Sequence, residues 1–227
     1  MSKNILVFGV TGSVGSYVYE SFKNLDNGKY NVIGTSSKVS KDFLYVTNDE
    51  LNSLININNL DVVIWCNGYN INDNIYDFDE DNYLKIMNIN INFIIKTLNF
   101  LLKNNKINNN CNMVLISSIW EKYVRENKLS YTISKAALGG LVRSLSCDLS
   151  DKNILVNNIL PGVIDNEMSR KTLSKEQIDN VKNHLKFDRL INLEDIFKTV
   201  KFLTLDNSAI TGESITIDLG FTSVKKI

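Results

Sequence analysis

The stretch ILVFGVTGSVG, residues 5–15, decides the fold that this sequence predicts. Its first four residues are typical of a buried β-strand, and a helical pattern begins near Val14. Three glycines separate the two. Such glycines allow a tight turn and let a pyrophosphate approach backbone N–H groups, while the helix dipole favours the same anion. A plain strand-to-helix turn is the alternative. The residues expected to contact a dinucleotide in this loop are Gly9, Thr11, Gly12, Ser13, Val14 and Gly15.

Outward from this strand, short apolar runs alternate with helical patterns along the chain. We expect strands at 5–9, 30–36, 43–46, 61–68, 113–118, 154–162 and 214–220, and helices near 14–25, 79–103, 131–149 and 193–205. Apolar strands with intervening helices are typical of a parallel sheet that is covered on both faces. The sequence therefore predicts an α/β fold, a Rossmann-type doubly wound parallel sheet, as a single domain over residues 1–227. Ligands bind such sheets at the carboxyl ends of the strands.

Composition narrows the possible partners. The 227 residues carry 25 basic and 25 acidic side chains, so the formal net charge is zero and neither nucleic acid nor a membrane is expected as a partner. Cys66, Cys111 and Cys147 are odd in number and far apart, which favours reduced thiols over a disulfide framework or a metal site. We expect a cytoplasmic protein, because no signal peptide and no apolar run of membrane-spanning length is visible.

A second pattern lies about a hundred residues after the glycine loop. Ser118, Tyr131 and Lys135 are thirteen and four residues apart, which places Tyr131 and Lys135 on one face of a helix. A nearby ammonium favours a phenolate and lowers the tyrosine pKa from about 10, so the phenol can act as an acid or a base. The hydroxyl of Ser118 could hold a substrate oxygen. The YTISK pattern by itself is common enough to occur by chance. We therefore interpret it together with the glycine loop and a later Pro-Gly as one set of motifs.

Together these motifs resemble the short-chain dehydrogenase/reductase family over nearly the whole chain. The resemblance implies hydride transfer between a nicotinamide cofactor and a carbonyl or secondary alcohol. It makes Tyr131 the general acid or base, places Lys135 on the nicotinamide ribose, and has Ser118 orient the substrate oxygen. Asn90, in MNINI, matches the helix asparagine that supports a proton-relay water. The alternatives are a turn-capping serine, a solvated lysine and a different register for the asparagine.

The resemblance also implies further cofactor contacts. CNG matches the family's Asn-Ala-Gly turn, and NNILPG matches the segment beside the nicotinamide. The implied cofactor-binding residues are Val46, Asn67, Gly68, Tyr131, Lys135, Pro161, Gly162 and Val163. The chain departs from the family pattern at Phe8, which replaces a threonine, at Trp65 and Cys66, which replace asparagines, and at Asn166, which replaces a threonine.

The end of the second strand bears on cofactor choice. An acidic residue there binds a ribose 2′-hydroxyl and repels a 2′-phosphate. This chain instead has Thr35 followed by Ser36, Ser37 and Lys38, whose hydroxyls and single cation suit a phosphate. The sequence therefore favours NADP over NAD, although no arginine clamp is present.

Three functions fit these patterns. The first is an NADP-dependent carbonyl reductase or alcohol dehydrogenase. The spacing of the glycines suggests a nucleotide-sugar epimerase or dehydratase, for which the chain leaves little material. The third is a non-catalytic NADP-sensing regulator, which would not need the Ser-Tyr-Lys set. The expected pocket is mixed and suits a small-molecule carbonyl or alcohol, such as a sugar derivative, a polar ketone or a modest ring system, with walls at Tyr69, Asn70, Trp120, Glu121, Tyr123 and Met168.

The long helices that carry Asn90 and Tyr131 resemble those that pair subunits in this family. A homodimer or homotetramer is the implied assembly. The apolar residues Leu138, Leu141, Val142 and Leu145 are candidates for the subunit contact, although all four could instead face the sheet.

Overall fold

The computed structural model describes residues 2–165, 169, 174–185, 187 and 189–224. Within them a seven-stranded, all-parallel sheet has the order β3-β2-β1-β4-β5-β6-β7. Its strands are β1 (Asn4–Phe8), β2 (Asn31–Ser36), β3 (Leu44–Tyr45), β4 (Leu60–Trp65), β5 (Ile107–Ile116), β6 (Leu155–Pro161) and β7 (Ser214–Ile217). The strand order reverses between β1 and β4, which is where such sheets form a ligand crevice. The predicted α/β doubly wound architecture is confirmed.

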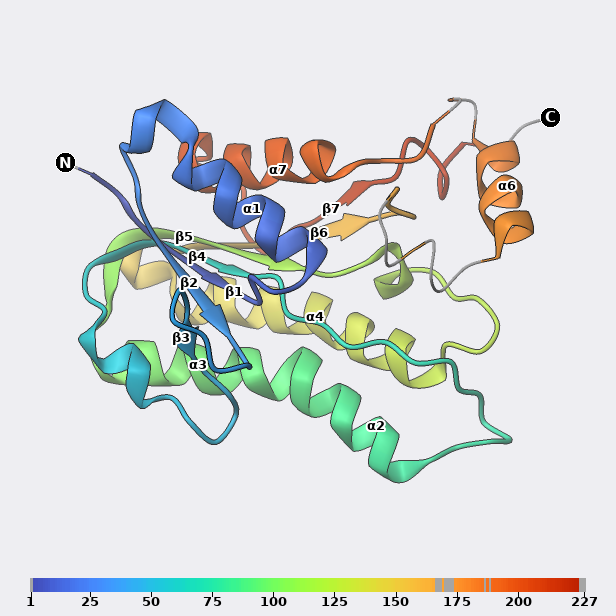
Figure 1. Cartoon of the computed structure of the whole chain (residues 1–227), viewed down its shortest axis with the longest axis horizontal. Helices are drawn as coiled ribbons and strands as arrows, with labels where there is room; N and C mark the ends of the chain where they lie inside the picture. Colours follow the sequence, from blue (N-terminus) through green and yellow to red (C-terminus); the bar gives the residue numbers. More distant parts are fainter. Residues whose placement is uncertain (1, 166–168, 170–173, 186, 188, 225–227) are drawn as a thin grey trace.

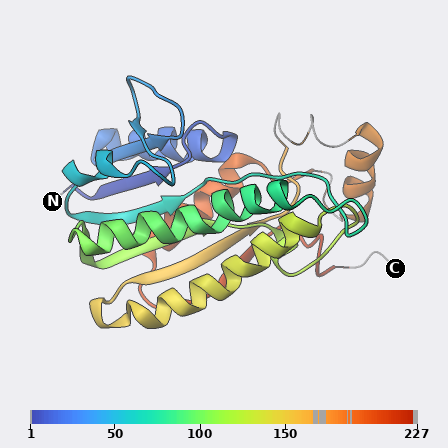
Figure 2. The same ribbon diagram turned by 90° about the horizontal axis from the view of Figure 1, so that it is seen from below.

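Helices cover both faces of the sheet (Figure 1). On one face lie α1 (Ser13–Lys23) and α7 (Leu193–Lys201), and on the other lie α2 (Glu80–Met87), α3 (Phe93–Lys103) and α4 (Leu129–Asp148). Figure 2 shows the helices of the second face side by side beneath the sheet. The short helix α6 (Lys175–His184) lies apart from both layers, on the side where the strands end.

Successive side chains of β1 point to opposite faces of the sheet, so this strand contributes to a hydrophobic core on each face. Ile5 and Val7 point to the core shared with α1 and α7, whereas Leu6 and Phe8 point to the core shared with α3 and α4. All four side chains are fully buried. A strand that is buried on both faces reads as a continuous apolar run, which is why the sequence pattern located it so clearly.

The expected helix over 79–103 follows one path but is not uniform. A π-helical turn, Asn88–Asn92, joins α2 to α3. Asp79 caps the start of α2 by accepting a hydrogen bond from the Asn82 backbone N–H. A π turn holds an extra residue and shifts the side chains that follow. Here it leaves Asn90 only 1% exposed, facing the other helices and the sheet.

Strand β5 begins earlier than the apolar run predicts. It starts at Ile107 and includes the asparagine cluster, and the pairing between β4 and β5 shifts in register there. Asn110 has φ +64°, and the side chain of Asn108 donates to Asp61 Oδ1 over 2.8 Å. Asn108 can form part of the sheet because the Asp61 carboxylate and the Asn59 carbonyl accept from its amide.

The four apolar residues proposed for a subunit contact face inward. Leu138 and Val142 are buried in the core beneath the sheet, and Leu141 and Leu145 pack against it. The alternative in which these residues cover the sheet is therefore the one that the single chain shows, while a subunit contact through the partly exposed Leu141 and Leu145 stays a prediction. The homodimer or homotetramer itself stays a prediction.

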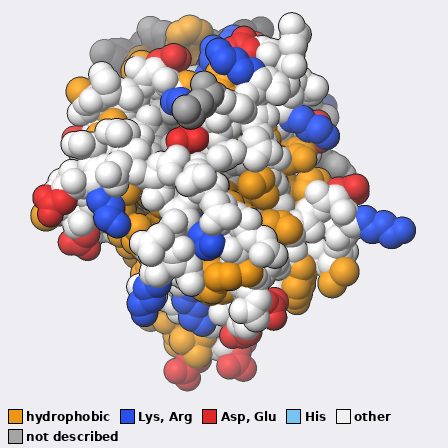
Figure 3. Space-filling model, turned by 90° about the vertical axis from the view of Figure 1, so that its left-hand side faces the viewer, with side chains coloured by type: hydrophobic (Ala, Val, Ile, Leu, Met, Phe, Trp, Pro, Cys, Tyr) orange, Lys and Arg blue, Asp and Glu red, His pale blue; other side chains and the backbone are white. Residues whose placement is uncertain are grey.

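The molecular surface away from α6 is mostly uncharged. Figure 3 views the molecule from the left-hand side of Figure 1 and shows acidic and basic side chains scattered over it without a field of one sign. Cys66, Cys111 and Cys147 are free thiols. In the described part of the chain no helix is long and apolar enough to cross a membrane, and no group of three His, Cys, Asp or Glu side chains could hold a metal.

A test of the fold lies at the contact between β1 and α1. A Cβ on Gly15 would lie 2.2 Å from the Gly9 carbonyl oxygen, so Gly15→Ala should lower the free energy of unfolding by about 2–3 kcal/mol. Gly140→Ala is the matched control, since Gly140 is exposed on α4 and its Cβ would meet nothing within 4 Å. It should raise stability by about 0.5–1 kcal/mol. Urea unfolding measures the free energy of unfolding of both variants. Equal changes in Gly15→Ala and Gly140→Ala would contradict the close approach of Gly15 to the Gly9 carbonyl.

Candidate active site

The glycine loop joins β1 to α1 at the centre of the sheet. Gly9 has φ +81°, and a Cβ there would lie 2.8 Å from the Asn67 backbone nitrogen. Gly9 and Gly15 are therefore required by the fold itself. A Cβ on Gly12 would make only an ordinary 3.5 Å contact with the Gly9 carbonyl oxygen. Packing within the described part of the chain therefore does not require a glycine at position 12.

The start of α1 fits the polyphosphate of a dinucleotide. Gly12 is its N-cap, no side chain caps the helix and no acidic residue lies in its first turn. The positive end of the helix dipole thus faces the loop with no carboxylate in the first turn to offset it, which favours an anion there. Beside the loop, Asn67 Oδ1 is a buried acceptor without a partner among the described residues, although Asn67 Nδ2 donates to the Ile89 carbonyl. The residues present fit the expected cofactor.

Two departures from the family pattern form one packed pair. Phe8 and Trp65 are register partners on β1 and β4, and their rings stack with centroids 5.5 Å apart. The Trp65 indole donates to the Thr97 hydroxyl over 3.0 Å. These aromatic side chains fill the core under the loop, so both departures concern packing.

The end of β2 lies next to the glycine loop, because the Gly9 and Val10 N–H groups both donate to the Thr35 carbonyl. The Ser36 hydroxyl is buried and accepts from the Lys38 N–H over 2.9 Å, which shapes the turn. Ser37 and Lys38 are exposed. The turn after β2 therefore presents a hydroxyl and a cation beside the glycine loop. No carboxylate lies among residues 35–38.

Val46 was expected to contact the cofactor. Its backbone N–H donates to the Ser36 carbonyl, but its side chain is 1% exposed and packs in the core. Only the backbone of Val46 is left for such a contact. At the other end of the expected site, Pro161 ends β6, and the Gly162 N–H donates to the Ile217 carbonyl. Val163 follows at the same edge, whereas Asn166 and Met168 lie outside the described residues.

The predicted Ser-Tyr-Lys set does come together. Ser118 follows β5 and caps a short 3₁₀ turn by accepting from the Trp120 N–H, while Tyr131 and Lys135 lie on the first turns of α4. Lys135 Nζ lies 5.6 Å from the centroid of the Tyr131 ring. Tyr131 remains partly exposed, and the other two side chains are buried.

Lys135 is a buried cation with a single hydrogen-bond acceptor among the described residues. Its Nζ donates to the Ile116 carbonyl at the end of β5 over 3.1 Å. Burial lowers the pKa of Lys135 from 10.5 to about 8, although the carboxylate of Glu121 acts in the opposite direction. The ammonium thus has donor capacity left toward the crevice.

The expected lowering of the tyrosine pKa is wrong for this structure. Burial raises the pKa of Tyr131 from 10 to about 12, and the Ser118 hydroxyl offsets only part of this rise. Burial destabilises the phenolate by more free energy than its hydrogen bond with Ser118 restores. At neutral pH the Tyr131 phenol is therefore protonated.

Asn90 acts on the loop that follows β4. Its Oδ1 accepts from the Tyr69 N–H over 2.8 Å, and its Nδ2 donates to the Tyr69 carbonyl and to the Ser134 hydroxyl. A Cβ on Gly68 would lie 3.9 Å from both Asn90 Oδ1 and Lys135 Nζ. The amide thus ties the Gly68 turn to α4 beside the lysine.

Sequence reasoning missed Lys128, Asp73 and Ser130. The Asp73 carboxylate accepts from the backbone N–H and the hydroxyl of Ser130, next to Tyr131. Lys128 Nζ lies 5.8 Å from the Tyr131 ring centroid and donates to Asn70 Oδ1 over 2.8 Å. Lys128 stands three residues before Tyr131, and this helical spacing was the signal that could have found it.

Glu121 was expected to line the substrate pocket, and this prediction is wrong. Its carboxylate accepts from the Ser214 hydroxyl over 2.6 Å and from the Asn158 side-chain amide over 3.0 Å. Glu121 therefore braces β6 and β7. Two other expected wall residues lie against cations: Lys85 Nζ is 4.7 Å from the Tyr69 ring centroid, and the Arg125 guanidinium carbon is 5.9 Å from the Trp120 ring centroid.

Comparisons with known proteins agree with this geometry. A family model described as enoyl-(acyl carrier protein) reductase matches residues 56–222. Dehydrogenase/reductase SDR family member 4 of Sus scrofa is 30% identical over 66% of this chain, and the match spans 54% of that protein, about half its length. The 3-oxoacyl-[acyl-carrier-protein] reductase FabG of Chlamydia trachomatis is 27% identical over 96% of this chain and 86% of its own.

A solved structure resembles the whole chain. The structure described as ElxO with NADP bound superposes with a TM-score of 0.83 at 25% identity, and it covers 99% of this chain and 100% of its own. Fold and site together define a Rossmann-type α/β protein whose serine, tyrosine and lysine meet at the carboxyl edge of the sheet. The chain belongs to the short-chain dehydrogenase/reductase family.

The buried Lys135 predicts a pH dependence of stability. Because its folded pKa of about 8 lies below the ordinary 10.5, the unfolded chain keeps a proton that the folded chain loses between these values. The free energy of unfolding then rises with pH in this window. Lys135→Met removes the effect. The stability of the native chain relative to the variant should grow by about 2–3 kcal/mol from pH 7 to pH 10, at about 1.4 kcal/mol per pKa unit.

Urea unfolding of both proteins at matched pH values measures this difference. A difference that stays constant from pH 7 to pH 10, or that falls, would contradict a depressed lysine pKa.

Proposed function

We propose that the chain is an NADP(H)-dependent oxidoreductase that interconverts a carbonyl compound and a secondary alcohol. The observation that carries this proposal is the convergence of Ser118, Tyr131 and Lys135 at the sheet edge, next to an uncapped helix N-terminus. A non-catalytic regulator would need the glycine loop but not this set.

Three observations support the dinucleotide cofactor. Gly12 is free of internal packing constraints, Asn67 Oδ1 is a buried acceptor without a partner among the described residues, and Ser37 and Lys38 directly follow β2. The similar structure, ElxO, is described with NADP bound. An exposed ammonium and hydroxyls suit a 2′-phosphate better than a 2′-hydroxyl, so we favour NADP over NAD.

The bound cofactor would supply or accept the hydride. The residues of the chain handle the proton and the orientation of the substrate. Tyr131, protonated at neutral pH, donates its phenolic proton to the carbonyl oxygen as negative charge develops there. Ser118 holds the same oxygen. Lys135 keeps a positive charge near the phenol and stabilises the phenolate that the transfer leaves behind.

The first test is Tyr131→Phe, which removes the donor and keeps the ring. General acid catalysis contributes about 10² to 10⁴-fold, so kcat should fall at least a hundredfold. Affinity for NADPH, measured by calorimetry, should change less than about threefold. The matched control is Tyr76→Phe, since Tyr76 is 95% exposed and has no part in the proposed chemistry. Turnover near normal in Tyr131→Phe would refute the assignment.

The second test addresses cofactor choice. Titration of the purified protein should show tighter binding of NADPH than of NADH. Lys38→Ala should weaken NADPH binding about three- to tenfold and leave NADH binding unchanged, because only NADPH carries the 2′-phosphate. Lys41→Ala, at another exposed lysine of the same loop, is the control. Preference for NADH would overturn the cofactor choice, and binding of neither would remove the basis of the proposed function.

A further inference from the structure

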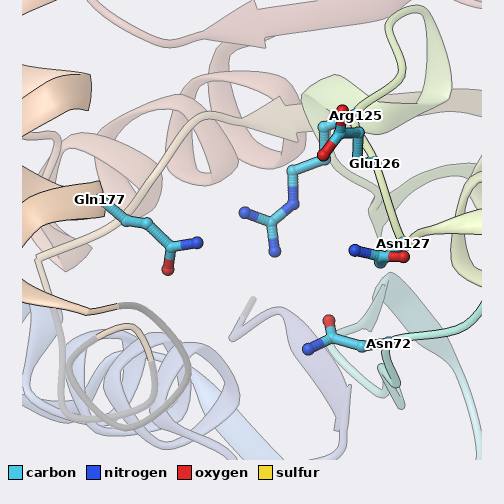
Figure 4. Close-up of a pocket in the computed structure, with 5 residues that line it drawn as sticks. All are labelled: Asn72, Arg125, Glu126, Asn127 and Gln177. Carbon is cyan, nitrogen blue, oxygen red and sulfur yellow. The ribbon is translucent and has the colours of Figure 1, made fainter.

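Beyond Tyr131, a polar cleft opens between the loop after β4, the loop before α4 and the helix α6. Its volume is about 350 Å³, and its walls are formed by Asn72, Arg125, Glu126, Asn127 and Gln177 (Figure 4). The proposed chemistry uses none of these residues.

Arg125 dominates the cleft. Figure 4 shows its guanidinium extending into the middle of the space, with the side-chain amides of Asn72, Asn127 and Gln177 around it. The Arg125 Nε is shielded from solvent and has no hydrogen-bond partner in the described part of the chain. The guanidinium carbon lies 5.9 Å from the centroid of the Trp120 ring, which supports it from one side. A buried donor without a partner is costly, so an arginine held in this way indicates a missing acceptor.

The groups next to Arg125 also indicate a site for a hydrogen-bond acceptor. Asn127, at φ +56°, accepts from the Asn74 side chain through Oδ1, so its Nδ2 is the end that faces the guanidinium. The exposed Glu126 is the one carboxylate among the lining residues, and it makes no ion pair with Arg125 within the residues that the structure describes. Donors therefore outnumber acceptors inside the cleft.

A second cation links the cleft to the reacting groups. Lys128 is 5% exposed, and its Nζ, 5.8 Å from the Tyr131 ring centroid, donates to Asn70 Oδ1 and to the Ile71 carbonyl. One of its three N–H groups is left for a ligand. Lys128 follows Arg125 by three residues, and burial together with the charge of Arg125 lowers the pKa of Lys128. Asp73 opposes them, but its carboxylate already accepts from Ser130.

We propose that the substrate is a carbonyl compound that carries an anionic group, a carboxylate or a phosphate, bound by Arg125 and Lys128 while its carbonyl oxygen meets Tyr131. Both anions offer the planar or forked oxygen pairs that a guanidinium binds with two parallel hydrogen bonds. This inference rests on the proposed function and narrows its substrate class.

The experiment compares matched substrate pairs with NADPH. One pair is a keto acid and its methyl ester, and the other is a phosphorylated hydroxyketone and the free hydroxyketone. For the native protein we expect kcat/KM to be at least thirtyfold higher for the anionic member of one pair, and the better pair distinguishes carboxylate from phosphate. Arg125→Met should remove most of this preference, chiefly through KM, and change kcat/KM for the neutral member less than threefold.

Further variants separate binding from folding. Asn127→Gly removes the amide donor and keeps the positive φ without strain, so it should reduce the preference more mildly. Lys128→Met should also reduce it. Lys152→Met, at an exposed cation beyond the far end of α4, should leave it unchanged.

The outcomes are distinguishable from failure of the proposed function. If the native protein reduces no carbonyl compound, the proposed function fails. If it reduces neutral and anionic partners equally well, or if both Arg125→Met and Lys128→Met keep the native preference, the anion site is refuted and the oxidoreductase assignment stands.

Discussion

The site depends on one buried charge. The Lys135 ammonium lies at the junction of three segments that are distant in sequence, and a single carbonyl at the end of β5 accepts its hydrogen bond. An ammonium at this depth is unfavourable unless its surroundings are fixed. The fold fixes the surroundings of the Lys135 ammonium in two ways. It packs α4 against the sheet, and it ties the Gly68 turn to α4 through the Asn90 amide. The strand order, the long helices and the loop after β4 all contribute to this one environment.

Charge is arranged locally although the chain as a whole is neutral. Arg125, Lys128 and Lys135 lie within eleven residues that run from the polar cleft to the interior of the site, and Tyr131 lies between the last two. Two nearby carboxylates are already engaged, Asp73 with Ser130 and Glu121 with β6 and β7, and the exposed Glu126 makes no ion pair with Arg125 within the described residues. This segment therefore presents a positive path toward the phenol that the net charge of zero conceals.

The sequence predicted the architecture well because its strands are buried on both faces and read as unbroken apolar runs. It also predicted that Ser118, Tyr131 and Lys135 would meet, since helical spacing and strand ends fix their positions. Prediction from the sequence failed where the pKa or the hydrogen-bond partners of a residue depend on groups that are distant in sequence. Burial, and not the neighbouring lysine, sets the Tyr131 pKa, and Glu121 turns toward partners some 37 and 93 residues away. The polar start of β5 was not predicted as strand, because the β4 carboxylate that accepts from Asn108, Asp61, is distant in sequence.

The π turn between α2 and α3 has a consequence for how this site can vary. Such a turn accommodates one residue more than an α-helix of the same span, so a single-codon deletion between Asn88 and Asn92 would still leave a continuous helix. The lost residue is the one that the π turn holds in excess, so the deletion would convert this segment into ordinary α-helix and redirect the side chains inside it, while α2 and α3 on either side keep their faces. The helix would survive, but the amide that holds the Gly68 turn would point elsewhere. A length change that alignment would score as minor could thus disconnect the lysine from its support while leaving the fold intact.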